Sequence, residues 1–192
     1  RGLPYLAMEL VNGEDLARVF DSGLMDPRRL AEIVASVART LHACHLAGVV
    51  HRDLKPSNVI MPADGTRPKV VDFGLARGAG AQRLTHTGAT LGTPQFMAPE
   101  QAVGASRATA PTVDVYQLGA ILYQGLAGMA PFQGGTLVQV LLLVSKAEPT
   151  PPSQLQEGVP VALQGGCQKA MSKAPAARYQ SALALAEDLD RF

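Results

Sequence analysis

The amino-acid sequence predicts a mainly helical α+β domain. Two long stretches carry helix signals, at residues 26–48 and 113–128, and two short strand-like stretches lie between them, at 58–61 and 68–71. With 192 residues, the chain has the length of one domain and can bury roughly 70% of its unfolded surface. Its hydrophobic content of 47% is that of a globular protein rather than a disordered one.

The chain begins with a predicted strand and a short helix. Residues 3–11 read LPYLAMELV, an apolar run that we expect to form a buried strand. The following NGEDL is expected to be a turn that leads into a short helix with Leu16, Val19 and Phe20 on its apolar side.

The long helix comes next. Asp26 can cap its start, Pro27 suits its first position, and Gly48 suits its end. Its apolar residues recur at helical spacing, so we expect one buried face made of Leu30, Ile33, Val34, Val37 and Leu41. The strands NVIM and PKVV follow, and Asp64-Gly65 between them predicts a hairpin.

The second half of the chain is predicted to be helical after an irregular segment. Residues 74–101 show no periodicity, and a loop of that length in a compact domain is usually functional or mobile. The helix at 113–128 is apolar nearly all round, which predicts a central buried position. Further helices are expected at 136–146, near 160–173 and at 181–190.

Composition excludes several classes of protein. A formal net charge of +1 gives no electrostatic reason to expect nucleic acid or an anionic membrane as partner. Two cysteines, Cys44 and Cys167, are too few for a disulfide framework and lack metal-ligand spacing, so a reducing, cytoplasmic setting is expected. The longest apolar run, at 137–144, is too short for a membrane span.

Chemistry is concentrated around the two strands. HRDLKPSN places Asp53, Lys55 and Asn58 just before the first strand, and VDFG places Asp72 at the end of the second. Phosphoryl transfer needs a carboxylate that accepts the proton of an attacking hydroxyl, and oxygen ligands that hold Mg²⁺ against the phosphates. Asp53 fits the first role, Asn58 and Asp72 fit the second, and Lys55 can offset charge on the transferring group.

These stretches, together with APE at 98–100, DVYQLG at 114–119 and PAARYQSA at 175–182, resemble the C-terminal lobe of a protein kinase. The resemblance implies that residues 1–192 are part of a kinase domain, with a hinge, a C-lobe and an activation segment at 72–100. It implies ATP with Mg²⁺ or Mn²⁺ as cofactors. It also assigns nucleotide contacts: Met8 as gatekeeper, Glu9 and Val11 through their backbone, and Ile60 beneath the adenine.

The same resemblance implies structural and regulatory roles. Asp114 would hold the catalytic-loop backbone, and Arg178 would pair with Glu100. Lys55 and the GTPQFMAPEQ stretch point to Ser/Thr specificity, with Thr93 bonding the catalytic Asp and Lys. LTHTGATLGT resembles the bacterial, eukaryotic-like Ser/Thr kinases. In that class Arg52 would grip a phosphorylated activation segment, with Thr85 and Thr87 as phosphorylation sites and Thr90 as a weaker candidate.

Two departures from the kinase pattern stand out. Gln117 occupies the place where Ser is usual in DVYSLG, and we expect no contact between it and the reacting groups. The 192 residues contain no Gly-rich loop and no strand Lys of the V-A-I-K type, features that lie upstream in a complete kinase. The N-terminal lobe is thus absent from this stretch, and we expect the stretch alone to be inactive or nearly so.

The expected function is therefore that of a Ser/Thr kinase lobe with protein substrates, in a protein that phosphorylates itself in trans as a dimer. A non-catalytic module, either a pseudokinase or a truncated kinase, is the first alternative, although Asp53, Asn58 and Asp72 are all intact. A small-molecule phosphotransferase of the aminoglycoside type is the second. It shares the H-x-D-x-x-x-x-N loop but is not expected to combine it with DFG and APE.

Overall fold

The helix α2, Pro27–Leu46, is the longest element of the computed structural model, which describes residues 9–73, 94–105 and 109–192. Its start is capped as predicted, because the Asp26 side chain accepts a hydrogen bond from the Arg29 N–H at 2.9 Å. Beyond its end, Gly48 adopts a left-handed conformation with φ of 77°. The predicted apolar face is buried throughout.

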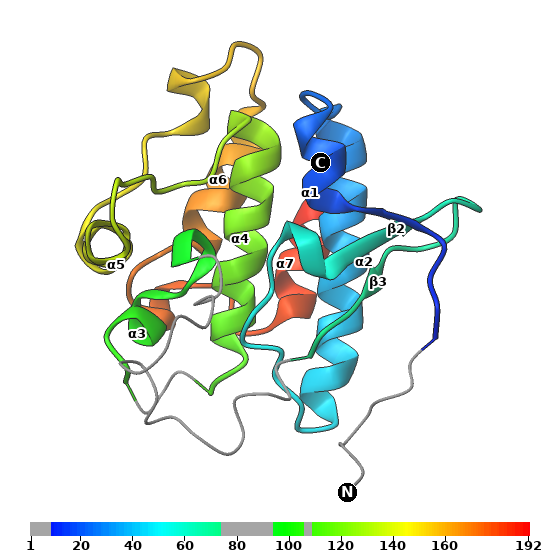
Figure 1. Cartoon of the computed structure of the whole chain (residues 1–192), viewed down its shortest axis with the longest axis horizontal. Coiled ribbons are helices and arrows are strands. Elements are labelled where there is room, and N and C mark those ends of the chain that lie inside the picture. The colour runs from blue at the N-terminus through cyan, green and yellow to red at the C-terminus, as the bar shows by residue number, and fades with distance from the viewer. Residues whose placement is uncertain (1–8, 74–93, 106–108) are drawn as a thin grey trace, which may run out of the picture.

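The helix α4, Thr112–Ala127, packs beside α2 at the centre of the molecule (Figure 1). It is buried nearly all round, as its composition predicts, and Gly128 ends it with φ of 74°. The two helices approach closely at Gly125, where an added Cβ would lie 2.6 Å from both methyl carbons of Leu30. The absence of a side chain at Gly125 therefore allows α4 to pack this closely against α2.

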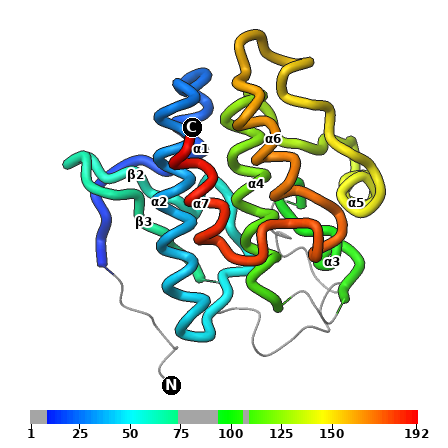
Figure 2. Tube along the Cα trace, turned by 180° about the vertical axis from the view of Figure 1, so that it is seen from behind, coloured from blue at the N-terminus to red at the C-terminus, as the bar shows by residue number. Residues whose placement is uncertain are grey.

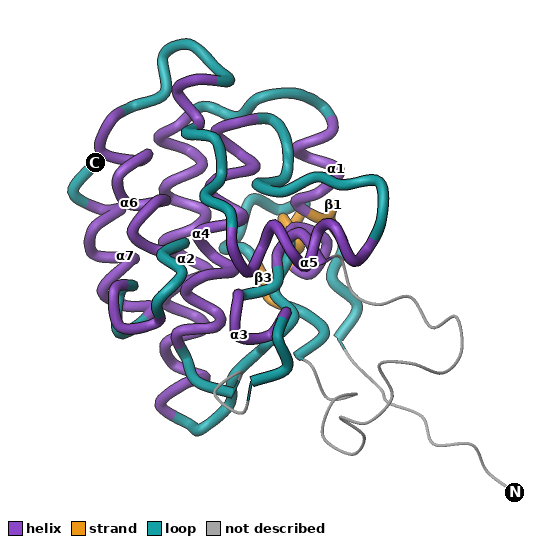
Figure 3. The backbone as a smooth tube through the Cα atoms, turned by 90° about the vertical axis from the view of Figure 1, so that its left-hand side faces the viewer, coloured by secondary structure: helices purple, strands orange, loops and turns teal. Residues whose placement is uncertain are grey.

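The other α-helices of the described C-terminal half surround α4. The helices α6, Val161–Ala170, and α7, Ala182–Asp190, pack against α4 and α2, and Figure 2 shows α7 covering the back of α2. The helix α5, Leu137–Lys146, lies on the other side of α4, next to the short helix α3, Pro99–Ala102 (Figure 3). Within the described ranges, no helix has the length and apolar character needed to cross a membrane.

A small antiparallel sheet covers the side of α2 opposite α7 (Figures 1 and 2). The strands β2, Val59–Pro62, and β3, Lys69–Val70, form the predicted hairpin, with Gly65 in the turn at φ of 74°. The third strand, β1, Gly13–Asp15, pairs with β2 and leads into the helix α1, Leu16–Asp21.

The strand β1 corrects one prediction. NGED was expected to be a turn, but residues 13–15 are extended and Gly13 lies opposite Pro62. An added Cβ at Gly13 would lie 2.2 Å from the Met61 carbonyl oxygen, so only glycine permits this approach. The strand expected at 3–11 lies mostly outside the described residues, and residues 9–12 are not in a strand.

Candidate active site

The loop at residues 51–58, which the resemblance predicts to be the catalytic loop, is fixed to α4 by Asp114. The fully buried carboxylate of Asp114 accepts hydrogen bonds from the backbone N–H of His51 at 2.9 Å and of Arg52 at 2.8 Å. Arg52 has φ of 67°, in the left-handed region that non-glycine residues rarely adopt. Such a conformation persists only where surrounding contacts hold it, and Asp114 supplies two of them.

His51 joins this loop to the segment that carries Asp72. Its Nδ1 accepts a hydrogen bond from the Asp53 N–H at 3.3 Å, so Nε2 carries the proton and donates to the Val71 carbonyl at 2.9 Å. The ring also packs against Phe73, with 4.8 Å between centroids. His51 is fully buried, which agrees with a packing role rather than an acid–base role.

Asp53, Lys55 and Asn58 lie together on the loop. The Lys55 ammonium is 3.5 Å from a carboxylate oxygen of Asp53, and both side chains are only partly buried. The Asn58 amide nitrogen donates to the Asp53 carbonyl at 2.8 Å, so its amide oxygen faces away from that carbonyl. A cation and a carboxylate thus meet at the protein surface beside an amide of fixed orientation.

Asp72 lies next to Asn58 because of the strand pairing. Val59 pairs with Val70, and the Val71 N–H donates to the Asn58 carbonyl at 3.0 Å, so the start of β2 and the end of β3 are adjacent. Asp72 is exposed and has φ of 57°, a left-handed conformation that Asp tolerates better than most residues. Strain of this kind is typical of functional positions.

The oxygens of Asn58 and Asp72 suit Mg²⁺. This ion commonly binds one or two protein ligands and completes its shell with water and phosphate oxygens. In the part of the chain that the structure describes, no group of three or more His, Cys, Asp or Glu residues is placed to hold a metal. Two oxygen donors, from Asn58 and Asp72, therefore fit a Mg²⁺ ion that also binds phosphate oxygens.

The predicted nucleotide contacts are only partly described. Glu9 precedes β1, and its carboxylate is 2.5 Å from the Lys69 ammonium. Val11 is half-buried, and Ile60 on β2 lies opposite Asp15. Met8, Thr85, Thr87 and Thr93 lie outside the described residues, as does Thr90.

The predicted Glu100–Arg178 pair is present and buried. Arg178 donates from Nη1 to one carboxylate oxygen of Glu100 at 2.7 Å and from Nη2 to the other at 2.8 Å. Its remaining donors bond backbone carbonyls, and its guanidinium lies 5.0 Å from the ring centre of Tyr116. This contact fixes α3 against the segment that precedes α7.

Three contacting residues were missed by sequence reasoning. His45 on α2 bonds the Asp114 carboxylate through Nε2 at 2.7 Å. Gln117 on α4 bonds the backbone of the loop at the Leu54 N–H and the Arg52 carbonyl, and Gln101 on α3 bonds Gln117. The available signal was the position of Gln117, a polar residue one turn after Asp114 in a mainly apolar helix.

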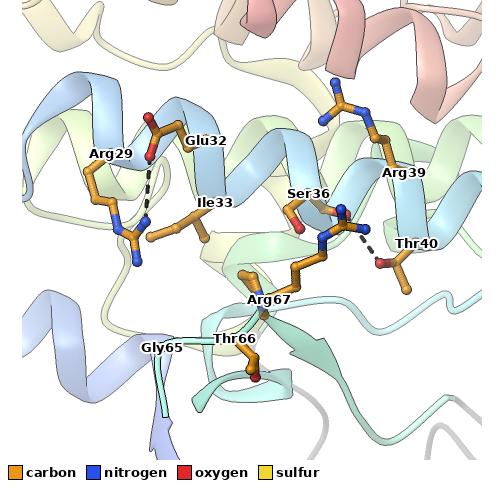
Figure 4. Close-up of a pocket in the computed structure, with 10 residues that line it drawn as sticks. Arg29, Glu32, Ile33, Ser36, Arg39, Thr40, Gly65, Thr66 and Arg67 are labelled. Carbon is orange, nitrogen blue, oxygen red and sulfur yellow. Dashed lines mark hydrogen bonds and ion pairs between the residues drawn. The ribbon is translucent and has the colours of Figure 1, made fainter. Parts of the chain in front are cut away.

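A cleft of about 570 Å³ lies elsewhere, between α2 and the β2–β3 turn (Figure 4). It is lined by three arginines, but Arg29 is 3.5 Å from Glu32, and Arg39 forms an ion pair with Asp190 on α7. Two of its cations are thus neutralised within the chain. None of Asp53, Asn58 and Asp72 lines this cleft.

Comparisons with known proteins agree with this geometry. A family model described as the protein kinase domain matches residues 3–179. The serine/threonine-protein kinase PknB of Mycobacterium leprae is 41% identical, in an alignment that covers 98% of this chain and 30% of that protein. The serine/threonine-protein kinase PknA of Mycobacterium tuberculosis is 39% identical over 92% of this chain and 40% of that protein.

A solved structure shows the same fold. The crystal structure of the PknI kinase domain of Mycobacterium tuberculosis superposes with a TM-score of 0.73 at 24% identity, over 96% of this chain and 64% of that chain. The chain spans 30% of the length of PknB, so the comparison concerns one part of such a protein. Because the family model matches well over half of the sequence, the chain belongs to the protein kinase domain family.

Proposed function

We propose that this chain is the catalytic lobe of a serine/threonine protein kinase, which transfers the γ-phosphoryl group of ATP to a Ser or Thr hydroxyl of a protein. One observation carries the proposal: Asn58 bonds the Asp53 carbonyl at 2.8 Å and accepts at 3.0 Å from the N–H of Val71, the residue before Asp72, so all three residues lie in one part of the fold. The similarity to Ser/Thr kinases at about 40% identity supports the choice of acceptor.

In the proposed reaction, the substrate hydroxyl oxygen forms a bond to the γ-phosphorus while the bond from that phosphorus to the β–γ bridging oxygen breaks. ADP leaves with that oxygen, and the carboxylate of Asp53 accepts the hydroxyl proton. Lys55, 3.5 Å from Asp53, offsets charge on the transferring group. Mg²⁺ or Mn²⁺, held by Asn58 and Asp72, would neutralise charge on the phosphates.

The other proposed roles extend from this centre. Met8, Glu9, Val11 and Ile60 would hold the adenine, and Thr93 would bond Asp53 and Lys55. Arg52 would bind phosphate on Thr85 or Thr87, which one copy of the protein would add to the other in a dimer. Among the described residues, the buried Nε of Arg52 has no hydrogen-bond partner, which supports a role in binding an anion.

The test is Asp53→Asn in the full-length protein, with a peptide that contains Ser or Thr as substrate. We expect transfer to fall by at least about 100-fold because the proton acceptor is lost, while Mg²⁺-ATP binding is retained. Asp72→Ala should weaken Mg²⁺-dependent ATP binding as well. Asp21→Asn, an exposed Asp at the end of α1, is the matched control and should leave both measurements unchanged.

Equal transfer by wild type and Asp53→Asn would remove Asp53 from the mechanism. A wild-type protein that binds Mg²⁺-ATP but transfers no phosphoryl group would favour the non-catalytic module instead. We also expect the 192 residues alone to transfer slowly, since they contain no Gly-rich loop to cover the phosphates.

A further inference from the structure

The backbone just before Asp53 needs support on both sides. Arg52 is in the left-handed region with φ of 67°, and the bonds from Asp114 to this loop reach the N–H groups of His51 and Arg52. The peptide group that joins Arg52 to Asp53 lies on the other side of this strained residue. Its carbonyl orientation sets the direction in which the Asp53 side chain leaves the loop.

Two glutamines hold that carbonyl. The Arg52 carbonyl accepts hydrogen bonds from Gln101 Nε2 at 2.6 Å and from Gln117 Nε2 at 3.1 Å. Gln117 Oε1 also accepts from the Leu54 N–H at 3.0 Å, so Gln117 bonds the backbone on both sides of Asp53. The side chain of Gln117 is buried, with 1% of the residue exposed, so water does not compete for these bonds.

The two glutamines also bond each other. Gln117 Nε2 donates to Gln101 Oε1 at 3.1 Å, and the same oxygen accepts from the Ala98 N–H at 3.0 Å. The neighbours fix both amide orientations, because a flipped Gln117 would place its oxygen against the Arg52 carbonyl and its nitrogen against the Leu54 N–H. The pair thus connects the catalytic loop to α3, which Glu100 and Arg178 anchor.

We infer that Gln117, together with Gln101, is a positioning residue that aims the Asp53 carboxylate and makes its placement depend on the seating of α3. The inference rests on the proposed kinase function for its effect on catalysis. Neither glutamine contacts the metal ligands or the nucleotide-binding residues in the hydrogen bonds of the described chain. Loss of the pair should therefore slow the transfer step without weakening ATP binding.

The test compares three single variants of the full-length protein. Gln117→Met and Gln101→Met keep the side-chain length and remove the hydrogen bonds. Gln124→Met is the matched control: Gln124 lies two turns further along α4, and its buried Oε1 has no partner in the described part of the chain. The measurements are kcat, the KM for Mg²⁺-ATP and the melting temperature.

We expect kcat to fall about 10- to 100-fold in Gln117→Met, which is the effect of a misplaced catalytic group, with the KM for ATP changed less than about twofold. Gln101→Met should show a smaller loss of the same kind. The double variant should be little worse than Gln117→Met, because the two side chains act on one carbonyl. The control should keep wild-type kcat.

A second measurement tests the positioning role of Gln117 separately from the proposed kinase function. Hydrogen exchange of the Leu54 amide should be faster in Gln117→Met than in wild type, while exchange within α2 stays unchanged, and this readout needs no activity. An inactive wild type would overturn the kinase proposal alone. Unchanged kcat and unchanged Leu54 exchange in Gln117→Met, or equal losses in the Gln124→Met control, would overturn the positioning role.

Discussion

Replacing Arg178 with Met should lower the free energy of unfolding by about 3–5 kcal/mol, the usual cost of leaving one partner of a buried ion pair alone. All five N–H donors of the guanidinium are used: two bond Glu100, and three bond the carbonyls of Ser172, Thr112 and Lys173. Arg178 is 3% exposed and Glu100 9%, so water cannot replace the lost donors fully. The side chain of Met fills a similar space without any donor.

Thermal and urea unfolding of the chain measure the effect. For a domain of this size, a loss of about 3–5 kcal/mol corresponds to a melting temperature lower by about 6–20 °C. The double variant Glu100→Met/Arg178→Met should recover part of the loss, because it removes the buried carboxylate but leaves the three carbonyls without a donor. Arg29→Met, which breaks an exposed pair, is the control and should change stability by less than about 1 kcal/mol.

A loss below about 1 kcal/mol in Arg178→Met would refute the reasoning, since it would show that the buried Glu100 finds water or another partner. A double variant as unstable as Arg178→Met would show that the unpaired carbonyls, rather than the carboxylate, dominate the cost. Either result would separate the charge from the hydrogen bonds in this contact.

Two further predictions concern packing and acid stability. Gly125→Ala should lower the free energy of unfolding in urea by about 1–2 kcal/mol, because the new Cβ would lie 2.6 Å from Leu30. Gly165→Ala is the control: the space around its Cβ is open, so it should raise the free energy of unfolding by about 1 kcal/mol. Equal effects of the two substitutions would refute the close approach of α2 and α4. The Tyr179 hydroxyl donates a hydrogen bond to Asp188 and holds the pKa of that carboxyl below its usual range. The contribution of this hydrogen bond to folding stability is therefore present above about pH 4 and is lost as the pH falls through the lowered pKa. Tyr179→Phe should therefore be less stable than wild type at pH 6, and the gap in melting temperature should shrink in acid; a gap that does not change with pH would contradict this.

Local patterns predicted most of the helices because their causes are local. The start of α2 follows from Asp26 and Pro27, and its buried face follows from apolar residues at helical spacing. The β2–β3 hairpin follows from Asp64-Gly65. The strand β1 was missed, because residues 13–15 are extended only through pairing with β2, and a glycine reads as a turn until its partner strand is known.

The site residues also fall into those that the sequence indicates directly and those that it does not. The residue types and order of Asp53, Asn58 and Asp72 indicate phosphoryl transfer from sequence alone, because that chemistry requires a proton acceptor and oxygen ligands at the ends of neighbouring strands. The Glu100–Arg178 pair was predicted only through the resemblance to protein kinases, since 78 residues separate its members. No spacing rule joins residues so far apart.

The sequence by itself therefore determined most of the helices, the hairpin and the chemical groups of this protein kinase domain, but not α3. Only the tertiary structure decided what supports those groups: the left-handed backbone of Arg52, the bond from His45 to Asp114, and the Gln101–Gln117 pair on the Arg52 carbonyl. The physical reason is that the direction of a hydrogen bond depends on how distant segments of the chain are placed in space. Gln117 on α4 and Arg52 on the loop are 65 residues apart in the sequence. Gln117, a polar residue in a mainly apolar helix, predicts that a hydrogen-bond partner exists, and the fold shows which groups it bonds.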